Sequence, residues 1–257
     1  DKLNRYLMVG MFLSYVAIIL WLMPEISAER LLYVDWKFSL LSFSVVVTSF
    51  GYQVIIPTLV TYLDRDIKST KRCLLFGSFI PLVVYVLWEL VILGSVSVLE
   101  PNGLLQAFRQ DEPLVKILRH QVNNDFITIL ARGFSIFAIV TSFLGVSQGL
   151  FDFLKDGLKV NLYPKRRPLA FILTFLPPIL FIVGFEKGFI ALLEYAGALV
   201  SIILGIMPIL IIWRLRNRNA HPSYRAPGNR LALTLGIIFF SFVVVLVLLK
   251  NFGLIVF

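Results

Sequence analysis

The residues that most often build metal sites, disulfides and catalytic centres are almost absent from this chain. Its 257 residues include one cysteine, Cys73, and two histidines, His120 and His221. A single thiol excludes a disulfide or thiolate metal framework, and two histidines in separate connectors do not make a metal site. We also find no serine–histidine–aspartate or cysteine–histidine arrangement and no phosphate-binding loop. We therefore expect no cofactor, no metal and no enzymatic activity.

Charge is also scarce, and apolar residues take its place. Charged residues make up 15% of the chain, hydrophobic residues 58%, and the mean hydropathy is +0.87. A soluble domain of this size cannot bury so much apolar surface. Crossing a bilayer takes about 20 apolar residues. Seven stretches fit, at about 6–24, 38–62, 73–98, 126–153, 169–185, 188–213 and 231–249. The sequence predicts an all-α integral membrane protein with seven transmembrane helices.

Lysine and arginine alternate between the two sets of connectors. Connectors 1–5, 64–72, 154–168 and 214–230 carry 16 of the 24 basic residues, and the opposite set carries 7. Because basic residues in short loops stay cytoplasmic, the start of the chain is predicted to be cytoplasmic and Phe257 external. The alternative is a solvated basic surface or a nucleic-acid patch. Regular alternation over seven spans favours topology, so we expect a lipid bilayer and no nucleic acid as partner.

The second span has a polar interruption at its middle. Thr48, Ser49, Phe50, Gly51, Tyr52 and Gln53 form it, and Pro57 follows. Glycine weakens the helix locally, and proline removes a donor. If the helix opens, one half begins near Gln53 and the other ends near Thr48 with free carbonyls, which suits an amino-acid zwitterion. The alternative is a kinked but continuous helix whose Gly51 packs on a neighbour.

The fourth span carries a second polar cluster. Thr141 and Ser142 begin it, and Ser142, Gly145 and Gly149 share one face of the helix. This face can present hydroxyls to a substrate or cation, or it can be ordinary packing between membrane helices. The sequence leaves both interpretations open.

Few charges fall inside the spans. Glu89 lies in the third span and, if buried, must be protonated, paired or facing water. It is a candidate for proton coupling, and the alternative is a neutral structural carboxyl. Glu194, near the start of the sixth span, is expected at the membrane interface.

Several blocks of residues, spread over essentially the whole chain, are distinctive in order and spacing. They are TSFG at 48–51 with IP at 56–57, GSFIPLV at 77–83 with Trp88, GLLQA at 103–107, TSFLGV at 141–146 with GLFD at 149–152, TFLPP at 174–178 with YAG at 195–197, and SYR at 223–225. Together these blocks resemble a known family, the aromatic amino acid permeases of bacteria, and they are closest to its tyrosine-specific branch.

The resemblance implies an inverted-repeat, LeuT-like carrier of the amino acid–polyamine superfamily with eleven membrane helices. The seven spans then match helices 5–11, and residues 1–257 are one transmembrane transporter domain that is incomplete at its N-terminus and lacks helices 1–4. The implied function is proton-coupled uptake of an aromatic amino acid, tyrosine above all, across the inner membrane. Residues 48–53, Ser142 and Gly145 would bind substrate, and Glu89, Thr141 and Ser142 are the candidates for the coupling ion. Glu89 stands where close relatives carry glutamine.

Two other functions compete with transport. A seven-helix receptor or light-driven pump would fit the number of spans, but a retinal pump needs a lysine inside its last helix. Lys250 falls at the membrane edge, and no lysine lies in the middle of that helix. The second alternative is a relative of the permeases that senses or scaffolds without transporting.

Overall fold

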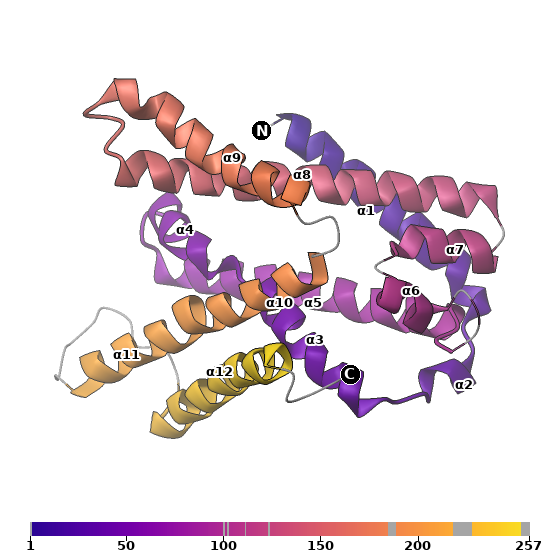
Figure 1. The fold of residues 1–257 in the computed structure, drawn as a ribbon. Coiled ribbons are helices and arrows are strands. Elements are labelled where there is room, and N and C mark those ends of the chain that lie inside the picture. The colour runs from indigo at the N-terminus through magenta and orange to yellow at the C-terminus, as the bar shows by residue number, and fades with distance from the viewer. Residues whose placement is uncertain are drawn as a thin grey trace. The chain divides into compact units, whose positions relative to one another are not determined.

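The fold is helical throughout the part of the chain that the structure, a computed structural model, describes. The described residues are 2–99, 101, 103–110, 112–122, 124–184, 189–217 and 228–252. In chain order the elements are α1 (Lys2–Leu22), η1 (Met23–Glu25), α2 (Ala28–Leu31), α3 (Trp36–Ser49), η2 (Tyr52–Ile55), α4 (Ile56–Tyr62), α5 (Ile67–Ser95), α6 (Leu104–Gln110), α7 (Leu114–Val122), α8 (Asp125–Gly157), η3 (Pro164–Arg166), α9 (Arg167–Gly184), α10 (Phe189–Val200), η4 (Ser201–Ile206), α11 (Met207–Asn217) and α12 (Arg230–Asn251). Figure 1 shows them along the chain.

Seven helical segments of the described chain are long and apolar enough to cross a membrane, as predicted. They are Asn4–Glu25, Ser42–Tyr62, Ile67–Ser95, Asp125–Gly157, Pro164–Gly184, Leu192–Asn217 and Arg230–Asn251. The largest error in a predicted boundary is at the third span, which starts at Ile67 and not near residue 73. The carboxylate of Asp66 accepts the backbone N–H groups of Lys68 and Ser69, so the helix begins there, before the sequence becomes apolar.

By its contacts the chain divides into two compact units. Residues 1–33 and 86–187 form unit 1, and residues 34–85 and 188–257 form unit 2. In unit 1, α1 packs along α8. Its aromatic core brings together Tyr15, Trp88 and Phe134, with ring centroids 5.2 to 6.3 Å apart. Ile18 and Ile127 are fully buried beside this core. Burial of these side chains holds the first and fourth spans together.

In unit 2, α10 packs against both α3 and α12 (Figure 1). Phe43 of α3 meets Phe239 and Phe242 of α12 edge to face, with centroids about 6 Å apart. Gly197 of α10 lies directly on the backbone of Ser44, where any side chain would overlap the Ser44 carbonyl. This contact brings α10 against the helix that leads into the interrupted segment.

Candidate functional site

The predicted break in the second span is confirmed. The α-helix α3 ends at Ser49, residues 52–55 form the 3₁₀-helix η2, and α-helical geometry resumes at Ile56. Gly51, at φ −74° and ψ 28°, leaves the helical path. Pro57 has no N–H to give the Gln53 carbonyl, and the N–H of Ile56 bonds that carbonyl instead. Gly51 and Pro57 thus interrupt the α-helix, and residues 52–55 between its two halves take the tighter 3₁₀ geometry.

Two details of the predicted break are wrong. The carbonyl of Thr48 was expected to stay unpaired, but it accepts the N–H of Gly51 at 3.0 Å. The second α-helical half starts at Ile56 and not near Gln53, because η2 occupies the residues between. The hydroxyls of Thr48 and Ser49 donate to carbonyls one turn back, at 2.9 and 3.0 Å. Short hydroxyl side chains often donate to a carbonyl of their own helix in this way. The hydroxyls of Thr48 and Ser49 therefore do not donate to the backbone carbonyls at the break.

Gln53 differs from Thr48 and Ser49 because its side-chain amide oxygen can still accept a hydrogen bond. Its Oε1 atom is shielded from solvent and has no hydrogen-bond partner among the described residues. Buried polar atoms are nearly always paired, and an exception inside a membrane span needs an explanation. An oxygen acceptor beside a helix break is suited to an ammonium group.

The aromatic residues of the break are tied to α5. The hydroxyl of Tyr52 shares a hydrogen bond with the hydroxyl of Ser78, which donates to the Leu74 carbonyl at 2.7 Å. The ring of Phe50 meets Tyr85 edge-on, with centroids 5.7 Å apart and planes at 89°. Tyr85 was not among the residues predicted for this segment, and the signal for it in the sequence is an aromatic residue in an otherwise aliphatic run.

The second polar cluster lies in unit 1, on α8. Thr141 donates to the Phe137 carbonyl at 2.8 Å, and Ser142 is exposed. A methyl group added at Gly145 or Gly149 would meet nothing within 4 Å. Of the two interpretations left open, close helix packing on this face is not seen among the described residues.

Gly145 lies in a groove beside this face, and Ser142 does not. The groove, about 1040 Å³ in volume, is lined by the start of α1, by α8 and by α9. Its polar lining includes Asn4, Gln148 and Arg167. The Oδ1 atom of Asn4 is shielded from solvent and, among described residues, has no partner. The structure thus places the two predicted clusters in different units, residues 48–53 in unit 2 and residues 141–145 in unit 1.

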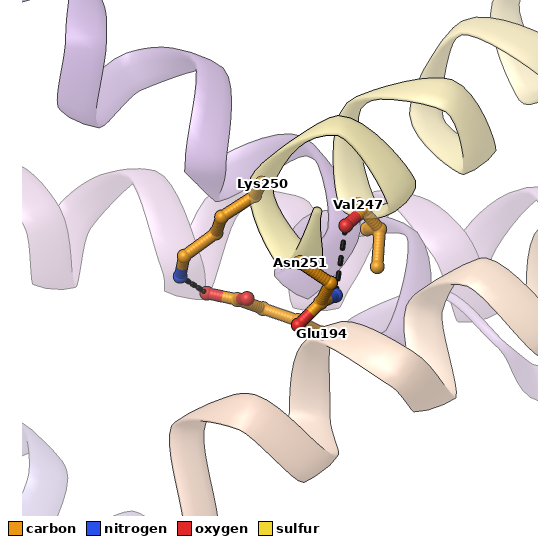
Figure 2. Close-up of polar contacts among 4 residues, drawn as sticks. All are labelled: Glu194, Val247, Lys250 and Asn251. Atoms are coloured by element: carbon orange, nitrogen blue, oxygen red, sulfur yellow. Dashed lines mark hydrogen bonds and ion pairs between the residues drawn. The ribbon is translucent and has the colours of Figure 1, made fainter. Parts of the chain in front are cut away.

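Glu89 and Glu194, two of the carboxyl groups in the spans, have opposite environments. Glu89 is exposed and, within the described chain, makes no hydrogen bond or ion pair. The Glu194 side chain, near the start of the sixth span, is only 4% exposed, and its Oε1 lies 2.6 Å from the Nζ of Lys250 (Figure 2). The sequence contained a signal for this pair, since these are the charged residues at the adjoining ends of the sixth and seventh spans. The predicted residues His221, 223–225 and Phe257 lie outside the described residues.

Comparison with known proteins places the chain in a group of bacterial carriers. The model of the tryptophan/tyrosine permease family matches residues 1–248. The chain is 34% identical to "Tyrosine-specific transport system 2" of Haemophilus influenzae, over 93% of the chain and 59% of that protein. It is 28% identical to the "Tryptophan-specific transport protein" of the same organism, with the same coverage. It is 29% identical to "Glutamine transporter 2" of Aliivibrio fischeri, over 93% of the chain and 61% of that protein. No solved structure matches the chain.

The relatives indicate the class of this protein, and the chain matches part of their length. The chain spans about 59% of the length of the first relatives it matches. The relatives are transport proteins, and seven described segments can cross a membrane. The protein is therefore a multi-pass protein of the inner membrane. With a family match over residues 1–248, the chain belongs to the tryptophan/tyrosine permease family.

Proposed function

We propose that the full-length protein carries an aromatic amino acid, tyrosine, into the cell together with protons by secondary active transport. Membership of the permease family supports transport, and a relative named for tyrosine supports the substrate. The observation that carries the proposal is the helix break at residues 50–55, inside a span, where the Gln53 amide oxygen has no hydrogen-bond partner among the described residues. Transporters place substrates at such breaks because interrupted backbone within the bilayer must be enclosed by protein or line a wet cavity.

The proposed architecture is a LeuT-like carrier of the amino acid–polyamine superfamily. The seven spans are then helices 5–11 of eleven, and residues 1–257 belong to one transporter domain that helices 1–4 complete. The relatives' greater length supports this assignment, as does the position of the break in the second of the seven spans, which becomes helix six. The start of this chain faces the cytoplasm and its end is external, which the distribution of basic residues supports.

In the proposed binding site, the ends of the broken helix hold the zwitterion. The Gln53 oxygen accepts from the ammonium, the N–H groups at the start of η2 face the carboxylate, and Phe50 and Tyr52 contact the ring. Thr48, Ser49, Gly51, Ser142 and Gly145 stay predictions for substrate binding. For the coupling ion the sequence offers Glu89, Thr141 and Ser142, and these stay predictions.

The test is uptake of radiolabelled tyrosine by the intact carrier, in competition with unlabelled tryptophan, phenylalanine and glutamine. We expect saturable tyrosine uptake that the aromatic competitors reduce more than glutamine does. Preferential inhibition by glutamine would contradict the aromatic assignment, and the glutamine transporter among the relatives makes that arm informative.

A matched pair of variants tests the part assigned to Gln53. A hydrogen bond to a charged group contributes about 1.5–3 kcal/mol, so Gln53→Leu should raise the KM about ten- to a hundred-fold. Gln110→Leu, at the exposed end of α6, is the control and should leave uptake unchanged. Equal KM values for the two variants would remove Gln53 from the site.

A sensor or scaffold related to the permeases remains the alternative function. The same assay separates them, since a non-transporting relative would bind substrate without accumulating it. A receptor or retinal pump is disfavoured because Lys250 is at the end of α12 and is paired with Glu194.

A further inference from the structure

A partly buried ion pair joins the sixth and seventh spans. The Glu194 side chain on α10 is 4% exposed and the Lys250 side chain on α12 is 28% exposed. Figure 2 shows the ammonium group reaching across to the carboxylate, while Asn251 beside it bonds its own helix at the Val247 carbonyl. Ionised groups in a membrane span are expensive to bury, and they persist mainly where they serve a function.

The pair borders a small cavity between three helices. Leu40 and Ser44 of α3, Glu194, and four residues of α12 line it, and its volume is about 10 Å³. A volume on the order of 10–15 Å³ holds one water molecule. Glu194 and Lys250 are the only charged residues in this lining. The charged residues in the sequences of the three helices that meet here are Lys37 in the first turn of α3, Glu194 in α10, and Arg230 and Lys250 in α12.

The same helix connects the pair to the break in the second span. Gly197, three residues beyond Glu194, lies on the backbone of Ser44. Val200 lies three residues further along α10, and its Cγ1 lies 3.6 Å from the position a β-carbon would take at Gly51. A shift of α10 relative to α12 therefore acts on α3 at the close contact between Gly197 and Ser44, and it moves Val200 beside the interrupted segment.

We propose that Glu194, held by Lys250, is the proton-binding site that couples the proton gradient to the interrupted helix. This rests on the proposed function, and it names the coupling group that the function requires. A proton entering from the external side, where the topology proposed above places this end of α12, binds the Glu194 carboxylate and forms an O–H bond. The ion pair is lost, and the partly exposed Lys250 ammonium keeps its charge and is solvated. α10 is then free to move from α12, and loss of the proton to the cytoplasm restores the pair.

Two assays on the intact carrier in proteoliposomes test this proposal. One measures tyrosine accumulation driven by a pH gradient, and the other measures exchange of labelled for unlabelled tyrosine at equal pH on both sides. Glu194→Gln mimics the protonated carboxyl, so we expect accumulation to fall at least tenfold while exchange persists. Glu112→Gln, which removes an exposed ion pair with Lys116, is the matched control and should retain both activities.

The outcomes of the two assays either support the assignment of Glu194 or overturn it. Full accumulation by Glu194→Gln overturns the proposal, and loss of exchange together with accumulation assigns the pair a structural role and also overturns it. If the single variant does not fold because Lys250 is left unpaired, the double variant Glu194→Gln/Lys250→Met removes both charges and is judged by the same two assays. Failure of the wild-type protein to exchange tyrosine would refute the proposed function, a result independent of the variants.

Discussion

Side chains that stand together in the sequence of the interrupted span have different surroundings. Thr48 returns its hydroxyl to the Ser44 carbonyl, Tyr52 bonds Ser78, and Gln53 has an oxygen without a partner. Local hydrogen bonds to the same helix explain the first case, since threonine reaches the carbonyl one turn back with little conformational change. Of these three described side chains, that of Gln53 leaves an amide oxygen that an incoming ligand can use without breaking an existing bond.

Asp66 gives a prediction about pH. Hydrogen bonds from the Ser69 side chain and backbone and from the Lys68 backbone hold the pKa of this carboxyl below its ordinary value of 3.8. The pKa of Asp66 is lower in the folded than in the unfolded protein. The Asp66 cap therefore makes its full contribution to the stability of the folded protein at pH values above the ordinary carboxyl pKa. This contribution is lost as the pH falls through the lower pKa of the folded protein. We expect Asp66→Asn to flatten the acid dependence of thermal unfolding in detergent.

The neighbouring Asp64 serves as the control for this measurement. It is exposed, and its side chain has no hydrogen-bond partner among the described residues, so Asp64→Asn should leave the acid dependence as in the wild type. Identical acid dependence for Asp66→Asn and the wild type would mean that the cap does not stabilise the start of α5.

Among the helices, α10 shows how one element joins several features. It carries Glu194, Gly197 and Val200 within two turns, and it continues into a π-helical turn at Ser201–Ile206. Pro208 gives a physical reason for that turn, since its ring crowds the carbonyl four residues earlier and offers no N–H. The wider turn places the Met207 N–H on the Ile202 carbonyl, five residues back. Such turns occur often at functional sites.

The contact of α10 with α3 predicts a strict size limit at Gly197. A methyl group there would overlap the carbonyl oxygen of Ser44, which is backbone and cannot rotate away. Overpacking of this kind costs about 1–3 kcal/mol, so Gly197→Ala should lower the Tm of the carrier in detergent. The control is Gly77→Ala, whose added methyl meets nothing within 4 Å. If the two variants melt at the same temperature, the close approach of these helices is refuted.

For the protein in its membrane, the orientation proposed from the basic residues is open to a direct test. Cys73 is the only cysteine of this chain, and it is exposed near the start of the third span, at the end proposed to be cytoplasmic. With cysteines outside this chain replaced, a membrane-impermeant maleimide should label Cys73 in inside-out vesicles and not in intact cells. Labelling in intact cells would reverse the proposed topology.

The opposite end of the same span gives the complementary control. Leu99, 65% exposed, lies just beyond the end of α5 at Ser95. In a Cys73→Ser background, Leu99→Cys should react with the same reagent from outside the cell. The two results together would fix the orientation of α5 and, by alternation, of the other six spans.

The number of spans and the position of the break could be predicted from the sequence. Both depend on local properties: about 20 consecutive apolar residues need the bilayer, and Gly51 with Pro57 disturbs the helix wherever it packs. Boundaries set by capping, such as Ile67 after Asp66, were less accurate because a polar first turn resembles a connector.

Which side chains contact one another became known from the packing of the helices. Glu194 and Lys250 are 56 residues apart, and each alone resembles an ordinary charge at the end of a span. Their pairing depends on the rotation and the axial position of each span relative to its neighbours. The same is true of the contacts of Gly197 with Ser44 and of Tyr52 with Ser78. Hydropathy carries no information on that register, since lipid and a neighbouring helix are equally apolar surroundings.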